Sequence, residues 1–159
     1  MEAEIVGHEV IEPCLRCGAS SRGVVTQAID GDRLTWGITS RCEGCADEGE
    51  DDGGAWGRMP DDLRQALIAG VGLARLRADP EVTRPLRLQV LRMFRRYGAS
   101  ISEASDTYDR LTDAGVTGTP AEMRLLARQL ETVGTRTRLD LPAEDGTAAP
   151  SGSGPRRLP

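Results

Sequence analysis

The chain of 159 residues contains no lysine, a single histidine and a single phenylalanine, so all 20 of its basic side chains are arginines. No apolar run approaches the roughly 20 residues that a membrane-spanning helix needs. The first residues, MEAEIVGHEVIEP, carry acids where a secretory signal has a basic region. These absences argue against a membrane or secreted protein, and we expect a cytoplasmic one. Arginine in place of lysine is typical of GC-rich genomes, such as those of actinobacteria.

The patterns of common catalytic sites are missing as well. The chain has no glycine-rich phosphate loop and no arrangement of serine, histidine and aspartate, and GVTGT at 115–119 is expected to be a turn before a helix. We therefore expect neither an enzyme nor a small-molecule substrate. With 28% charged and 38% hydrophobic residues, the composition is that of an ordinary globular protein.

Charge is distributed unevenly along the chain. Residues 1–57 contain four arginines and 12 acids, which gives −8, whereas residues 58–159 contain 16 arginines and 13 acids, which gives +3. The formal net charge is −5. This imbalance indicates two parts with different roles.

The four cysteines form two Cys-x-x-Cys pairs, Cys14 with Cys17 and Cys42 with Cys45, and 24 residues separate the pairs. In a reducing compartment this pattern favours metal binding over disulfides. The alternative is a redox motif, but that would be a single pair at a helix start in a βαβ unit.

Between the pairs, GVVTQAI and RLTWGIT flank Asp-Gly-Asp, and apolar residues alternate in the second segment. This pattern predicts a β-hairpin.

Such a hairpin brings its two ends together, so that four thiolates converge in the tetrahedral shell that zinc accepts. Residues 12–56 therefore resemble a zinc ribbon, with Cys14, Cys17, Cys42 and Cys45 at the four ligand positions of that family. The resemblance implies one structural Zn²⁺, because four thiolates leave no position open for a substrate or for water.

Two further features near the cysteines have simpler interpretations than ligand binding. His8 lies in IVGHEVIEP, a predicted strand, and the four cysteines already complete the shell, so we expect an ordinary strand residue. The acidic run ADEGEDDGG at 46–54 lacks the regular alternation and the terminal glutamate of an EF-hand calcium loop. We expect a solvated linker there.

From Met59 onward apolar residues recur at helical spacing. A first helix is predicted from Pro60 to about Gly70, with Leu63, Ala66, Leu67 and Val71 on one face. LARLR at 73–77 fits either a strand or a helix. A second helix is predicted from about Pro85 to Tyr97, where Gly98 ends it. Its expected core face consists of Leu86, Val90, Met93, Phe94 and Tyr97.

Capping boxes mark the starts of two more helices, at Ser100 with Glu103 and at Thr119 with Glu122. The expected core residues are Ile101, Ala104, Tyr108 and Leu111 in the third helix, and Met123, Leu126, Ala127, Leu130 and Val133 in the fourth. TRTRLDL at 135–141 alternates as a strand does, with Leu139 and Leu141 facing the core. Residues 142–159 have no such pattern and are predicted to be disordered.

Two segments, VLRMFRRYGASISEASDTY and GVTGTPAEMRLLARQLETVGTRTRLDL, are similar to the C-terminal domain of the bacterial ribosomal stalk protein. Gly98, Ser102, Glu103 and Ala104 lie at that family's Gly-Leu-x-Glu-Ala positions, and Gly134 with the strand at 135–141 matches its closing part. The family's following lysine is replaced by serine here. The resemblance implies a small α/β fold whose equivalent of the second helix faces binding partners.

The second predicted helix presents a basic face opposite its core face. On a helical wheel, this face contains Arg84, Arg87, Leu88, Leu91, Arg92, Arg95 and Arg96. It is either a solvated surface or a contact surface for a partner protein, since arginines around exposed leucines combine charge with apolar area as interfaces do. Phosphate contacts are also conceivable, but the acidic first half opposes the approach of nucleic acid.

The sequence thus predicts an α+β protein in three parts. Residues 1–57 are a four-cysteine zinc ribbon of antiparallel β-hairpins with an acidic linker, 58–141 are a small, mainly helical α/β domain with about four helices and a closing strand, and 142–159 are a tail. We expect residues 59–141 to fold without the ribbon. The predicted function is a non-catalytic adaptor or inhibitor, such as a toxin-immunity protein, that binds a protein partner. The alternative is a nucleic-acid-binding zinc-ribbon protein.

Overall fold

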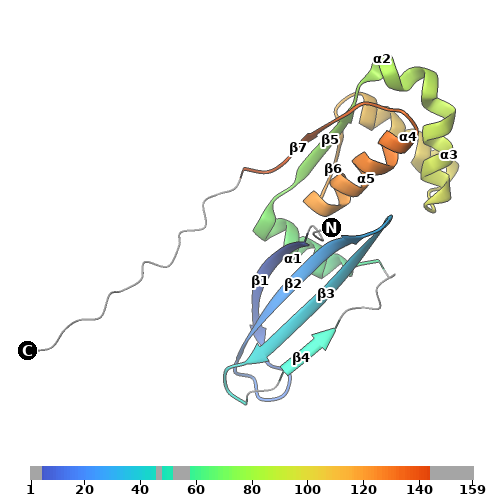
Figure 1. The fold of residues 1–159 in the computed structure, drawn as a ribbon. Helices are drawn as coiled ribbons and strands as arrows, with labels where there is room; N and C mark the ends of the chain where they lie inside the picture. The colour runs from blue at the N-terminus through green and yellow to red at the C-terminus, as the bar shows by residue number, and fades with distance from the viewer. Residues whose placement is uncertain (1–4, 46–47, 52–57, 144–159) are drawn as a thin grey trace, which may run out of the picture.

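The computed structural model describes residues 5–45, 48–51 and 58–143, which form an α+β fold with two separate antiparallel sheets (Figure 1). The predicted fold class is confirmed. The predicted disorder after residue 143 and most of the acidic linker lie outside the described residues. Among the helices within the described ranges, none is both long and apolar enough to cross a membrane.

The first sheet has the strand order β1-β2-β3-β4. Its strands are β1 Ile5–Pro13, β2 Ser20–Asp30, β3 Arg33–Cys42 and β4 Glu48–Asp51. The predicted hairpin is confirmed, since Asp30 pairs with Arg33 around a turn in which Gly31 has φ 61°. The acidic run was expected to be a solvated linker, but its central residues form β4 and pair with β3. Negative charge therefore did not prevent strand pairing at this sheet edge.

One face of the first sheet is covered by α1, Asp61–Val71. Leu67 of α1 is fully buried and clusters with Val25 of β2 and Met59, while Trp36 and Ile38 of β3 pack around them. Antiparallel strands with one buried and one solvated face alternate in this way. The apolar face of α1 is therefore buried by the cysteine-bearing sheet. The boundary between residues 57 and 58 remains a prediction.

The second sheet has the order β6-β5-β7, with β5 Ala74–Ala78, β6 Val116–Gly118 and β7 Thr137–Asp140. The open question about residues 73–77 is resolved in favour of a strand, in which Ala74, Leu76 and Ala78 are buried and the two arginines between them are exposed. The expected turn at 115–119 is instead mainly β6, because three residues suffice to pair with β5.

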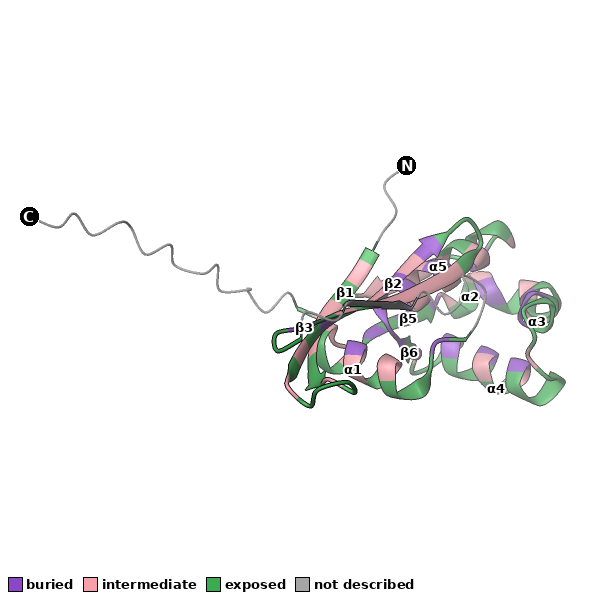
Figure 2. Ribbon diagram, turned by 90° about the horizontal axis from the view of Figure 1, so that it is seen from below, coloured by how far each residue is buried: buried purple, intermediate pink, exposed green. Residues whose placement is uncertain are grey.

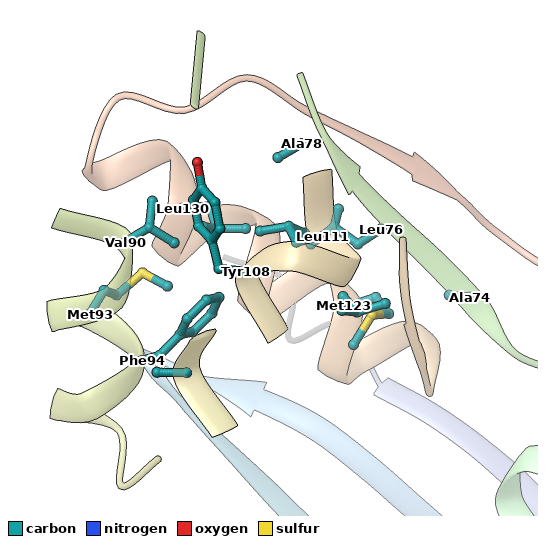
Figure 3. Close-up of a cluster of buried hydrophobic side chains, with 12 residues drawn as sticks. Ala74, Leu76, Ala78, Val90, Met93, Phe94, Tyr108, Leu111, Met123 and Leu130 are labelled. Carbon is teal, nitrogen blue, oxygen red and sulfur yellow. The ribbon is translucent and has the colours of Figure 1, made fainter. Parts of the chain in front are cut away.

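Helices pack on the buried face of this second sheet and form the main core. They are the short α2 Pro80–Thr83, a 3-10 turn at Arg84–Leu86, α3 Arg87–Arg96, α4 Ile101–Thr112 and α5 Pro120–Thr132. Figure 3 shows side chains of α3, α4 and α5 meeting those of β5. In Figure 2, the outer side of α4 is exposed and its buried residues lie toward the strands. Both predicted capping boxes, at Ser100 and Thr119, are confirmed.

Three residues that were expected in the core are exposed. Tyr97 is 49% exposed because α3 ends at Arg96 and the tyrosine no longer follows the helical period. Ile101, at the first position of α4, is 69% exposed, and Leu141 lies beyond the end of β7. Each is at the end of an element, which is the part of a periodic pattern that is predicted least reliably.

A polar network joins the first sheet, α1 and α5. Arg64 of α1 donates two hydrogen bonds of 2.7 Å to the carboxylate of Glu122 on α5. The Thr119 hydroxyl, which caps α5, donates to the side-chain oxygen of Gln27, a residue of β2 that is only 2% exposed. Beside this network, Ala121 and Leu125 of α5 pack against Ile29 of β2. Helix α5 thus has one face in the main core and another on the cysteine-bearing sheet.

Candidate metal centre

The four cysteines lie at one end of the first sheet: Cys42 is the last residue of β3, and the other three lie in the turns that follow β1 and β3. The register places Pro13 opposite Ser20 and Ser21 opposite Cys42, so the two turns begin side by side. The four Sγ atoms all lie within 4.8 Å of one another. Cys17 Sγ is 3.4 Å from Cys42 Sγ, and Cys14 Sγ is 3.9 Å from Cys45 Sγ. The structure therefore brings together all four predicted ligands.

These distances fit a tetrahedral metal site. Four thiolates at a Zn–S distance of about 2.3 Å would have their sulfur atoms about 3.8 Å apart. The separations of 3.4 and 3.9 Å bracket that value. A disulfide requires sulfur atoms about 2.05 Å apart, and all four cysteines are free. The cluster is compatible with a zinc ribbon that binds one metal ion.

Backbone groups of the two turns are arranged around the sulfur atoms. The Arg16 N–H donates to Cys14 Sγ at 3.4 Å, and the Gly44 and Cys45 N–H groups donate to Cys42 Sγ at 3.2 and 3.5 Å. Such hydrogen bonds favour the thiolate over the thiol. The Cys45 N–H, and after it the Gly44 N–H, lower the pKa of the Cys42 thiol to about 6, although burial opposes the shift. At neutral pH Cys42 is therefore mainly a thiolate, which is the form that binds a metal cation.

Two glycines allow the turns to form and to approach each other. Gly18 has φ 73°, which a side chain rarely adopts, and its N–H donates to the Cys14 carbonyl at 2.8 Å. Gly44 has another role, because a Cβ atom there would lie 2.6 Å from the Ala19 Cβ and 3.3 Å from Cys17 Sγ. Gly18 directly follows the first Cys-x-x-Cys pair, where the turn requires this backbone geometry. Gly44 was missed, although its place inside the second Cys-x-x-Cys pair was visible in the sequence.

The arrangement offers metal binding and little else. Four thiolates complete a tetrahedral shell, so no position remains at which the metal would activate water or bind a substrate. His8, as predicted, is not part of the cluster: it lies in β1 opposite Val25, and its ring is against Gly70 of α1. The tight packing at Gly70 is a further contact between the cysteine-bearing sheet and α1.

The residues of the predicted partner surface have different surroundings. Leu88 is 64% exposed, whereas Leu91 is half-buried and packs against the main core, contrary to the expectation that both leucines lie on the surface. Arg87 lies over the Tyr108 ring at 5.3 Å and donates to the Ser105 hydroxyl. The remaining arginines are exposed, and their guanidinium groups have no hydrogen-bond or ion-pair partner among the described residues: Arg84, Arg92, Arg95 and Arg96.

Comparisons of the chain with protein-family models, with curated proteins and with solved structures found no match. The resemblance of the second part to the C-terminal domain of the ribosomal stalk protein therefore remains a prediction.

Proposed function

We propose that the chain is a non-catalytic, zinc-stabilised adaptor or inhibitor that binds an acidic protein partner through the exposed face of α3. The observation that supports this proposal is the surface formed by Arg84, Leu88, Arg92, Arg95 and Arg96, which we call the α3 face. It combines four arginines that lack a partner among the described residues with one exposed leucine.

Helical geometry gathers these side chains around the leucine. Arg92 and Arg95 follow Leu88 by four and seven residues, and residues at these spacings share one helix face, while Arg84 lies in the 3-10 turn just before α3. Leu91 and Arg87 lie on the side toward the core. Partner-binding sites in proteins often have this composition, with an apolar anchor surrounded by arginine.

The α3 face is electrostatically unfavourable in the isolated chain. Arg92 has arginines three and four residues further along the helix, and like charges at this spacing destabilise a helix by a few tenths of a kcal/mol. No acid occurs between Glu81 and Glu103. An acidic partner would relieve this repulsion, and the same field would accelerate its approach.

A protein partner is favoured over nucleic acid because the α3 face is not purely basic. Leu88 and, at the end of the helix, Tyr97 add exposed apolar area, which phosphate groups do not use. The residues before 58 carry a formal charge of −8, which repels a polyanion at long range. Nucleic acid remains the alternative and is tested alongside.

The test compares two charge reversals of equal size. The variant Arg92→Glu with Arg95→Glu changes the α3 face, and Arg75→Glu with Arg77→Glu changes two exposed arginines of β5 that also lack a partner among the described residues. Each protein captures partners from an extract of the source organism, and quantitative mass spectrometry compares what is retained. We expect a partner that the wild type and the β5 variant retain and the α3 variant loses.

Binding of the purified partner is then measured at about 50 to 200 mM salt, next to a random-sequence RNA and DNA duplex. Apolar anchoring predicts a modest loss with salt, whereas phosphate contacts predict a loss of several powers of ten when many phosphates are bound. The proposal is wrong if no retained protein distinguishes the two variants. Tight oligonucleotide binding that depends on the same arginines would establish the alternative.

A further inference from the structure

A shallow groove of about 390 Å³ lies between the tip of the β2–β3 hairpin, α5 and the end of α3. Its apolar lining comes from three elements that are distant in the sequence: Leu34 of β3, Leu125 and Leu126 of α5, and Tyr97 after α3. Gln129 of α5 donates to the Asp32 carbonyl at 3.4 Å and so ties the hairpin tip to the helix. We call this hollow the Tyr97 groove.

The charged groups along the Tyr97 groove already have partners. Glu122 is held by Arg64 at 2.7 Å, and Arg58 lies 3.2 Å from Asp61. Asp32 lies 3.8 Å from Arg33. Since these charges are compensated, the groove offers an incoming group mainly its apolar lining. Such a hollow suits an apolar side chain better than a charged one.

The Tyr97 groove adjoins the α3 face. Tyr97 directly follows Arg96, the last residue of α3, and its half-exposed ring lines the groove. A tyrosine at such a border provides a large apolar ring together with a polar hydroxyl. The charged and the apolar parts of the surface therefore meet at the C-terminal end of α3, where Arg96 and Tyr97 are adjacent.

We propose that the Tyr97 groove binds an apolar side chain from an acidic peptide segment of the partner, while carboxylates of the same segment pair with Arg92, Arg95 and Arg96. This inference rests on the proposed function of the α3 face, and it names the partner as an acidic linear segment with an apolar anchor. Basic grooves with apolar pockets recognise such segments by this division of roles.

The test selects binders from a random peptide library displayed on phage, with the full-length, metal-loaded protein as bait. Enriched peptides are synthesised, and their dissociation constants are measured for three single variants. Tyr97→Ser removes the ring, Tyr97→Phe retains it, and Ile101→Ser removes an exposed apolar side chain that does not line the groove. Thermal unfolding of each variant verifies that the fold is intact.

We expect enriched peptides that combine acids with a leucine or an aromatic residue. Tyr97→Ser should weaken their binding by about tenfold or more, whereas Tyr97→Phe and Ile101→Ser should change it by less than about threefold. Replacing the apolar anchor of the peptide by serine should cause a similar loss. Anchor loss and ring loss should not add, because both remove the same contact.

The groove proposal and the proposed function can fail separately. If Arg92→Glu with Arg95→Glu abolishes peptide binding but Tyr97→Ser has no effect, the groove proposal is wrong and the α3 face stands. The opposite result contradicts the role of the α3 face and leaves the groove as a binding site. Enrichment of no peptide above the background of the α3 variant overturns both.

Discussion

The structure predicts that α1 loses its stability when the metal is removed, whereas α3 and α4 do not. The fully buried Leu67 of α1 packs on the cysteine-bearing sheet, whereas the equally buried Leu111 of α4 belongs to the main core. Metal binding and folding of a small metal-stabilised sheet are coupled, because the unfolded chain has no preformed site. A chelator should therefore uncover the apolar face of α1 together with the sheet.

Truncating each of these two leucines shows how much each cluster contributes to stability. Leu67→Ala and Leu111→Ala remove the same atoms from fully buried sites, and such truncations cost about 2 to 5 kcal/mol. Among the described residues, three buried ones form the cluster of Leu67, whereas 12 form that of Leu111. The smaller cluster has more freedom to collapse, so we expect about 2 to 3 kcal/mol for Leu67→Ala and about 3 to 5 kcal/mol for Leu111→Ala.

Native-state hydrogen exchange with and without chelator is the assay. Chelation should remove protection from β1, β2, β3 and α1, and leave α3 and α4 protected. Leu67→Ala should lower the free energy of opening of the metal-dependent region, and Leu111→Ala that of the main core. If α1 stays as protected as α4 after chelation, the metal-bound sheet does not support α1, and the result would favour the expectation that residues 59–141 fold alone.

Three further predictions concern the metal site and the polar network. Cys42→Ser should reduce bound metal from one ion per chain to almost none by elemental analysis, and full retention would contradict the four-thiolate site. Gly44→Ala should weaken metal binding about tenfold in a chelator competition, because supporting contacts around metal ligands have effects of that size. Gly18→Ala is the control, since a Cβ atom there lies in open space. It should lower the stability by only about 1 to 2 kcal/mol, because alanine is strained in the left-handed conformation of this residue. Glu122→Gln keeps the capping bond but removes the ion pair with Arg64, and denaturant unfolding should show a loss of about 1.5 to 3 kcal/mol at pH 7. Burial raises the pKa of Glu122, but the hydrogen bonds from Arg64 and Thr119 lower it by more than burial raises it. The pKa in the folded protein is therefore below the unfolded value. The ionised form therefore stabilises the fold above about pH 4.3, and this contribution is lost as the pH falls through the folded pKa. A wild-type advantage over Glu122→Gln that persists at pH 2 would contradict this assignment.

The sequence allowed the cysteine cluster and the starts of α4 and α5 to be predicted because both are local patterns. Cys14 and Cys42 begin two identical spacings around a hairpin, and Ser100 and Thr119 each precede a glutamate by three residues. In each case a few neighbouring residues contain all the groups that make the interaction. The structure adds the distances but changes none of these assignments.

What could not be predicted depends on contacts between distant segments. The apolar stripe of α1 is clear in the sequence. The sequence does not indicate, however, that Leu67 packs against Val25 of β2 and not against the main core. Likewise β4 exists because β3 offers it an edge, since a run of acids and glycines has little strand propensity of its own. The exposure of Tyr97 follows from where α3 stops, which is the least reliable part of any periodicity argument.

Through these contacts, a bound metal would act at a distance from its ligands. It would hold the ends of β1 and β3 together, and the β2–β3 hairpin extends from there to the opposite end of the sheet, where its tip forms one wall of the Tyr97 groove. The α3 face, in contrast, is on a helix whose buried residues all belong to the main core. Loss of the metal would therefore remove the apolar anchor site but leave the arginines in place. The association rate with an acidic partner would therefore change little, while the dissociation rate would increase.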